Sequence, residues 1–321
     1  MKQLSSNRRR FLQLALASCA AASLPWQDGR AQPGGVTLAD VNRMTLDAFV
    51  ASFGDTFELA PWVAQRAYAR RPFATVTALF EAMYDTLRSS THAEQIAFLG
   101  KFSDLYNPAP PTGTITEASK GEHGSVGFDR LSTAAAARFE QATKAYKAKF
   151  GYTYVICVRR YSLASILSEL DRHLRNDASA ELEETMKQVA YISRLRVAEQ
   201  VTGPGVPKVY GDVTAHVLNA MVGKPASGVV VELHEMYGDE ARKVAQAVTT
   251  ADGRADLMKN RPVPIGRYEM RFAIGDYFHK SGMPVAEPFF DVVPMRLFIA
   301  KSEESYHVPL IVTPFNYSTH G

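Results

Sequence analysis

Apolar residues recur every three or four positions through residues 36–200, the spacing that places side chains on one face of an α-helix. These stripes predict helices over 46–53, 61–67 (with proline in the first turn), 76–87, 96–105, 131–150, 163–174 and 182–195. Three prolines predict a loop over 106–116. Residues 152–158 are apolar and β-branched, which indicates either a short strand or an extended buried segment. This part of the chain is therefore predicted to be an all-α domain.

The period of the pattern changes to two after residue 208. Apolar residues alternate with polar ones over 229–234 and 268–274, which is typical of strands with one buried face. Asp252-Gly253 lies between two strand-like runs and predicts a hairpin, while residues 238–243 could hold a short helix. Short strands separated by turn residues predict an antiparallel sandwich.

Four glycines and prolines within residues 201–208 separate the two patterns and indicate a short, stiff linker. The predicted order is a helical domain over 32–200, the linker, and an all-β sandwich over 209–321. A length of 321 residues agrees with two domains, each large enough to bury a core.

Residues 1–31 have the pattern of a signal peptide. Three arginines at 8–10 precede an alanine-rich apolar run over 14–24, which fits a twin-arginine export signal and predicts a periplasmic protein. The run is much shorter than the roughly 20 residues that cross a bilayer, so no transmembrane span is expected in the mature protein. The alternatives are a disordered basic tail and, because residues 16–19 resemble a lipoprotein cleavage box, a lipid anchor at Cys19.

Removal of this segment changes the charge balance. The chain has 36 basic and 33 acidic residues, of which five basic and one acidic lie in residues 1–31. The remainder carries 31 basic and 32 acidic residues, a net charge of about −1, so no global basic field favours nucleic acid as a partner. Cys157 would be the one thiol left, and no intrachain disulfide is expected.

Three polar residues stand out in the strand-rich part: His216 and His307 in predicted strands, and Arg254 after the Asp252-Gly253 turn. A single strand histidine is usually structural. In this order and spacing, however, the three segments resemble the 5-hydroxyisourate hydrolases, the enzymatic relatives of transthyretin. The resemblance covers about the last third of the chain and includes residues 223–226 and 275–278.

The resemblance implies a transthyretin-like sandwich that opens a cyclic amide in a purine-derived substrate. His216 and His307 would be the acid/base pair and Arg254 would hold the substrate. These types suit the chemistry, because histidine titrates near neutrality and arginine offers a planar fork of donors. No metal and no cofactor are implied. Family members form the pocket at a subunit interface, so a homo-oligomer is expected.

The end of the chain departs from the family pattern. The family closes with Tyr-Ser-Thr-Tyr-Arg-Gly-Ser, whose last four residues line the pocket, whereas residues 317–321 read Tyr-Ser-Thr-His-Gly. His320 thus replaces a tyrosine, and the arginine and final serine are absent. Ser318 and His320 are expected to bind substrate, with His320 a possible substitute donor.

The helical part resembles the decarboxylases for 2-oxo-4-hydroxy-4-carboxy-5-ureidoimidazoline, all-helical enzymes that follow the hydrolase in urate breakdown. The resemblance covers nearly the whole domain and rests on residues 57–58, 61–64, 71–73, 119, 122, 150–152, 154–158 and 194–196. It implies that Arg196 and the segment containing Tyr154 and Ile156 bind a ureido or carboxylate group.

The decarboxylase-like site also departs from its family. The family uses a histidine in Ala-His-Pro-Asp-Leu, and Phe102 stands at that position here. Phenylalanine cannot carry a proton. Glu122 matches the catalytic glutamate, but His123 replaces the glutamine after it. Either His123 has taken over proton transfer, or the domain has reduced or lost activity and now binds, scaffolds or dimerises; we favour the second.

The sequence therefore predicts an exported enzyme of urate degradation that hydrolyses 5-hydroxyisourate. It joins this hydrolase to a decarboxylase-like domain of reduced or lost activity. The alternative is a non-catalytic exported protein of transthyretin type that binds a small ligand or acts as a scaffold.

Overall fold

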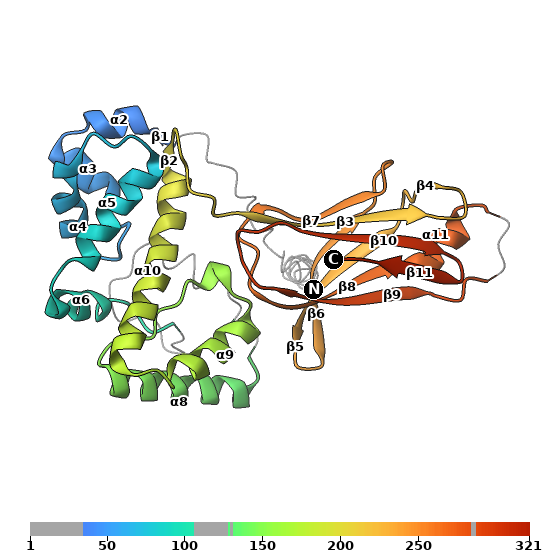
Figure 1. Cartoon of the computed structure of the whole chain (residues 1–321). Helices are drawn as coiled ribbons and strands as arrows, with labels where there is room; N and C mark the ends of the chain where they lie inside the picture. Colours follow the sequence, from blue (N-terminus) through green and yellow to red (C-terminus); the bar gives the residue numbers. More distant parts are fainter. Residues whose placement is uncertain (1–34, 106–127, 129–130, 284–286) are drawn as a thin grey trace, which may run out of the picture.

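The computed structural model describes residues 35–105, 128, 131–283 and 287–321, with a helical part followed by a part built of strands (Figure 1). This order confirms the predicted fold class. The helical part contains β1 (Val36–Thr37), α2 (Leu38–Arg43), α3 (Leu46–Phe53), α4 (Pro61–Ala67), η1 (Tyr68–Arg70), α5 (Val76–Arg88), α6 (His92–Leu99), α8 (Thr133–Phe150), η3 (Val158–Arg160), α9 (Leu163–His173), α10 (Ala178–Gln200) and β2 (Val201–Thr202). The predicted leader and the predicted loop over 106–116 lie outside the described residues. Within the described part of the chain, no helix combines the length and apolar character needed to span a membrane.

Local capping signals begin several helices at the predicted positions. The side chains of Thr45 and Thr75 accept hydrogen bonds from backbone N–H groups in the first turns of α3 and α5. These N–H groups have no partner within the helix, so the caps stabilise both starts. α4 instead begins with Pro61, whose fixed φ and missing N–H suit the first turn.

The helix predicted over 96–105 is displaced. α6 begins at His92, and its last residue is followed by Gly100. Thr91 and Glu94 form a capping box, in which each side chain bonds the other's backbone N–H. The prediction was wrong because it followed the apolar residues and overlooked this polar start signal.

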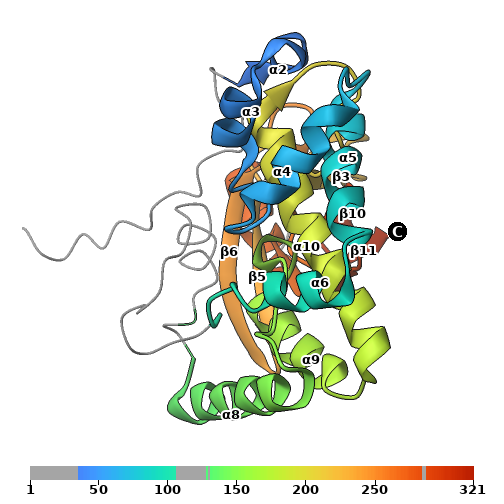
Figure 2. The ribbon, with the colours of Figure 1, turned by 90° about the vertical axis from the view of Figure 1, so that its left-hand side faces the viewer.

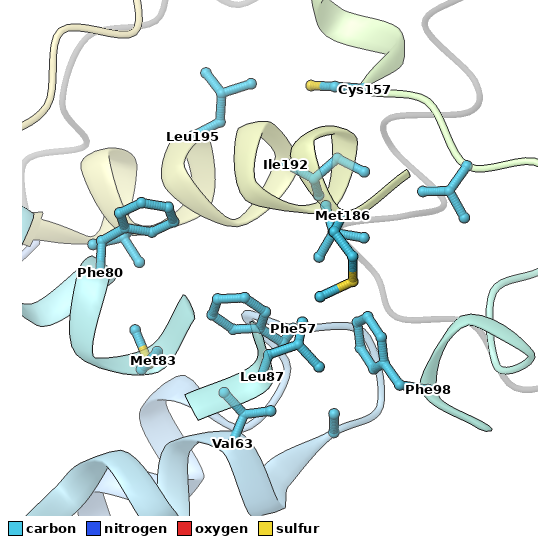
Figure 3. Packing of buried hydrophobic residues seen from close by; sticks show 14 of the residues in the cluster. Phe57, Val63, Phe80, Met83, Leu87, Phe98, Cys157, Met186, Ile192 and Leu195 are labelled. Carbon is cyan, nitrogen blue, oxygen red and sulfur yellow. The ribbon is translucent and has the colours of Figure 1, made fainter. Parts of the chain in front are cut away.

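The long helix α10 runs through the helical part (Figures 1 and 2). Its buried residues lie on several faces, as expected of a helix that others surround. Figure 3 shows Met186 and Ile192 of α10 in one apolar cluster with Met83 and Leu87 of α5. Close packing of such side chains fixes the relative positions of the helices.

The segment over 152–157 is buried, has no regular secondary structure and leads into η3. The sequence left a short strand or an extended buried segment open, and the segment is buried but is not a strand. The linker packs on the helical part: Val201–Thr202 pairs with Val36–Thr37, and the carbonyls of Pro204 and Gly205 accept hydrogen bonds from the first turn of α5.

The second part is a two-layer sandwich. Its elements are β3 (Gly211–Asn219), β4 (Lys224–Pro225), β5 (Val230–Tyr237), β6 (Glu240–Val248), β7 (Arg254–Arg261), β8 (Gly266–Ala273), α11 (Ile274–Lys280), β9 (Val292–Ile299), β10 (Tyr306–Thr313) and β11 (Asn316–Thr319). One sheet has the order β11-β10-β3-β4 with β7 also paired to β3, and the other has the order β6-β5-β8-β9. The pairing is antiparallel except between β10 and β3, which run parallel.

Two local predictions in the sandwich were wrong. The Asp252-Gly253 turn is present, but it is not a hairpin within one sheet, because β6 pairs with β5 and β7 pairs with β3. Residues 238–243 form the β5–β6 turn and the start of β6, and the helix of the sandwich is α11 instead. Turn residues predict a local bend of the chain. They do not predict which strands pair, because pairing depends on distant parts of the chain.

The helical part docks on the sandwich through backbone groups. Ser162 N donates to the carbonyl oxygen of Ile265 at 2.9 Å, and Ile265 N donates to that of Arg160 at 2.6 Å. Leu163 N donates to Oε1 of Glu235 in β5 at 3.1 Å.

Two cavities of about 720 and 400 Å³ lie between α8, α9 and the sheet that contains β5. None of the residues that line these two cavities belongs to β3, β7 or β10 of the other sheet.

Candidate functional site

β3 presents alternate residues to two environments. Val213, Ala215 and Val217 are buried in the sandwich core, whereas Thr214 and His216 are partly exposed. Successive side chains of a strand point to opposite faces. The alternation that builds the core therefore places His216 on the outer face of the sheet.

The strands on either side of β3 bring Arg254 and His307 to the same face. Arg254 of β7 is directly opposite His216, and His307 of β10 is opposite Thr214. The ring centroids of His216 and His307 are 6.2 Å apart. Three residues that are distant in the sequence therefore meet within one chain, on an open sheet face rather than in either interdomain cavity.

The hydrogen bonds of the two imidazoles differ in kind. His216 Nε2 is 3.0 Å from the carbonyl oxygen of Asp252. A carbonyl can only accept, so Nε2 carries the proton and Nδ1 of neutral His216 carries the lone pair. His307 Nδ1 is 2.8 Å from the hydroxyl of Thr214, which can donate or accept.

Partial desolvation and neighbouring positive groups favour the neutral form of His307. Although His307 lies exposed on the sheet face, the strands around it exclude enough water to lower its pKa below the usual value, and Arg254, His216 and His320 lower the pKa further. The guanidinium of Arg254 is 3.6 Å from Asp252, but both side chains are more than half exposed, so solvent screens this pair. Arg254 therefore keeps a positive charge available at the open face.

The strand β11 supplies the predicted substrate-binding residues. Ser318 is opposite Ile311 of β10, and Thr319 is opposite Leu310. His320 follows directly after β11, and its charge lowers the pKa of His307. Ser318 lies further along the same pair of strands.

The described residues of the decarboxylase-like site are held within the helical core. Phe102 is half-buried and meets Phe98 edge-on, with ring centroids 5.4 Å apart. Nη1 of Arg196 donates to Oε2 of Glu58 at 3.1 Å, and Arg196 is 9% exposed. Tyr154 and Ile156 are also buried. Glu122 and His123 lie outside the described residues.

Among the residues that the structure describes, no cluster of three or more His, Cys, Asp or Glu side chains is arranged to hold a metal.

Comparisons with known proteins divide the chain at the same place. The family model of OHCU decarboxylase matches residues 42–198, and that of the HIUase/transthyretin family matches residues 213–321. A 2-oxo-4-hydroxy-4-carboxy-5-ureidoimidazoline decarboxylase of Haloferax volcanii is 32% identical over 51% of this chain and 96% of its own length. A 5-hydroxyisourate hydrolase of Halalkalibacterium halodurans is 46% identical over 34% of this chain and 96% of its own length. The chain belongs to both families.

The OHCU decarboxylase and HIUase/transthyretin domains follow one another in the predicted order. Both halves therefore belong to enzyme families of urate degradation. A solved structure of (S)-allantoin synthase also matches 89% of this chain and 99% of its own, at 25% identity and a TM-score of 0.45.

Sequence reasoning missed two groups at the HIUase-like site, the Thr214 hydroxyl and the Asp252 carbonyl, which bind the two imidazoles. A signal for the first was present, because Thr214 lies two residues before His216 and must share its face. The second is a backbone group in a turn, and no residue type marks it.

Proposed function

We propose that the sandwich domain hydrolyses 5-hydroxyisourate as a step of urate degradation. The observation that carries this proposal is the meeting of His216, Arg254 and His307 on one sheet face. Hydrolysis of a cyclic amide needs a base for the attacking water, a positive group for the carbonyl oxygen, and a proton for the leaving nitrogen. This cluster offers all three.

The proton steps can be assigned from the electrostatics. The lowered pKa of His307 keeps its imidazole neutral at neutral pH, so it can accept a proton from water. The water oxygen then bonds to the carbonyl carbon, and Arg254 stabilises the negative oxygen. When the carbon–nitrogen bond breaks, a protonated imidazole of the His216–His307 pair donates its proton to the nitrogen. One water is consumed and the histidines regain their starting state.

The direct test follows 5-hydroxyisourate by ultraviolet absorbance after it is generated from urate. The purified protein is expected to accelerate its decay over the rate in buffer, and a His307→Ala variant is expected to lose this acceleration. Decay at the buffer rate would leave the other candidate function, non-catalytic binding of a small ligand by a transthyretin-like scaffold. The replacement of the family tyrosine by His320 is the feature that favours this second candidate.

We further propose that the helical domain has reduced or lost decarboxylase activity. Phe102 stands at the position of the family's histidine, where it packs against Phe98, and phenylalanine itself cannot carry a proton. The expected result is that Phe102→His raises decarboxylase turnover by at least tenfold, because acid/base catalysis contributes about 10²–10⁴-fold. Turnover is measured by release of CO₂ from freshly generated substrate. Phe102→Leu is the matched control and should leave the rate unchanged; equal rates for both variants would indicate a deeper loss.

A homo-oligomer is part of the proposal. In the described sheets, β9 and β11 are edge strands, and Phe298, Ile311 and Tyr317 on or beside them are exposed. Open edges with exposed apolar side chains favour pairing with another copy. Light scattering during size-exclusion chromatography should give a mass above 35.3 kDa, and the monomer mass would contradict this.

Export to the periplasm is also proposed, from the paired arginines and the apolar run in residues 1–31. Replacement of Arg8 and Arg9 by lysine is expected to leave the protein in the cytoplasmic fraction of cells with a twin-arginine system. If the variant protein is still found in the periplasmic fraction, export by the twin-arginine route is refuted.

A further inference from the structure

Thr214 contacts the site without belonging to the three residues that carry the chemistry. Its hydroxyl is 2.8 Å from Nδ1 of His307, and no other described residue bonds the His307 side chain. We propose that Thr214 is a positioning residue of the hydrolase site, which holds His307 by Nδ1 and so makes Nε2 the nitrogen that exchanges protons. This inference rests on the proposed hydrolysis.

The two histidines are held by partners with different chemistry. The Asp252 carbonyl only accepts, which fixes one tautomer of neutral His216. The Thr214 hydroxyl can accept from a protonated Nδ1 of His307, and Nε2 can then gain and lose a proton while this bond persists. Nδ1 of His216 is likewise the nitrogen left to exchange a proton in that ring. The lowered pKa of His307 is therefore what distinguishes it as the base, and its contact with Thr214 is what selects Nε2.

The fold makes this contact stiff. Thr214 and His307 are directly opposed in the parallel pairing of β3 and β10, and that pairing runs from Tyr306 to Val312. Threonine is β-branched and has restricted χ1, so its hydroxyl position follows from the strand. A hydrogen bond from a fixed hydroxyl limits rotation of the imidazole, and sites built on strands are held more precisely than sites on loops.

Other groups near His307 define the control experiments. Arg254 of β7, His216 of β3 and His320 act on His307 electrostatically. Asp256 of β7 is opposite Thr214 and is paired with Lys259, with Oδ2 and Nζ 2.9 Å apart. An altered titration of His307 must therefore be assigned to the lost hydroxyl rather than to these charges.

The test combines kinetics with NMR of the full chain labelled with ¹⁵N-histidine. Thr214→Val keeps the shape of the side chain and removes the hydroxyl. The protonated imidazole then loses an acceptor, so the pKa of His307 should fall by about 0.5–1 and the ratio of its neutral tautomers should change.

We expect kcat to fall by about 10–100-fold with KM within about threefold, and the acid limb of the kcat profile to move to lower pH. Thr214→Ser should restore both, and the His307 signal is assigned by its loss in His307→Gln.

The readouts separate two kinds of failure. An unchanged His307 titration and tautomer ratio in Thr214→Val would overturn the role of Thr214, whatever the kinetics. An equal shift in Asp256→Asn would overturn it too, because charge and not the hydroxyl would then set the titration. If the wild-type protein does not hydrolyse 5-hydroxyisourate, the hydrolase proposal fails, while the NMR comparison still decides whether Thr214 positions His307.

Discussion

Replacing His307 by glutamine is expected to lower kcat/KM for 5-hydroxyisourate by about 10²–10⁴-fold, the usual contribution of a positioned acid/base group. The glutamine amide can still form a hydrogen bond with Thr214, so the packing of β3 against β10 should persist. It cannot accept a proton from water near neutral pH. The loss should therefore appear mainly in kcat, measured from the initial rate of absorbance decay.

The matched control is His279→Gln. His279 lies on α11, is about half exposed and pairs with Glu287, and neither residue belongs to β3, β7, β10 or β11. This variant should stay within about twofold of the wild type, because substitutions at such exposed positions usually change stability little. If His307→Gln also stays within threefold, the base is another group and the proposed mechanism is wrong.

The sign of the pH dependence follows from the lowered pKa of His307. The imidazole must be neutral to act as a base, so activity should fall as pH decreases through that pKa and stay level above it. Because desolvation and Arg254 hold this pKa below the ordinary value near 6.5, the midpoint of the decline should lie below that pH. The fall in activity at low pH is assigned to His307 if the residual activity of the His307→Gln variant no longer shows it.

Much of the site could be predicted, but by resemblance rather than by pattern. The alternation around His216 gives its face, yet nothing in the local sequence says that Arg254 and His307 lie on neighbouring strands. Parallel pairing of β10 with β3 joins residues about 90 positions apart, and strand periodicity carries no information on partners. For the same reason the Asp252-Gly253 turn was taken for a hairpin, although it connects the two sheets.

The helices were more predictable because their signals are local. α3, α4 and α5 begin at the predicted residues, where a threonine or a proline marks the start. α11 was missed: its seven residues, Ile274–Lys280, directly follow β8, and the strand pattern runs into its first residue. Short helices of this kind depend on tertiary packing, here the burial of Ile274 and Phe278.

A buried polar network in the helical domain leads to the second large effect. Glu181 of α10 is fully buried and accepts hydrogen bonds from His173 Nδ1 at 2.7 Å and Asn176 Nδ2 at 2.8 Å. The hydroxyls of Tyr146 and Thr185 complete the set. Burial alone would raise the pKa of Glu181, but the bonds from His173 and Tyr146 outweigh it and the pKa is lowered. This one carboxylate therefore connects α8, α9 and α10.

Glu181→Ala is expected to lower the free energy of unfolding of the helical domain by about 3–5 kcal/mol, because it leaves several buried donors without an acceptor. Urea unfolding followed by tryptophan fluorescence measures this domain selectively. Trp62 lies in α4, and the other tryptophan, Trp26, lies in the predicted leader, so the sandwich contains none.

The matched control and the pH dependence make this prediction specific. Glu183 lies on the same helix with an exposed side chain paired to Lys187, so Glu183→Ala should leave the free energy of unfolding almost unchanged. Because the folded-state pKa of Glu181 is lowered, its stabilisation is complete above the unfolded value of about 4.3 and is lost as pH falls through the folded pKa. The difference between wild type and Glu181→Ala should therefore shrink below about pH 4. A constant difference across that range would mean that the alanine acts through a cavity rather than through the loss of a charged acceptor.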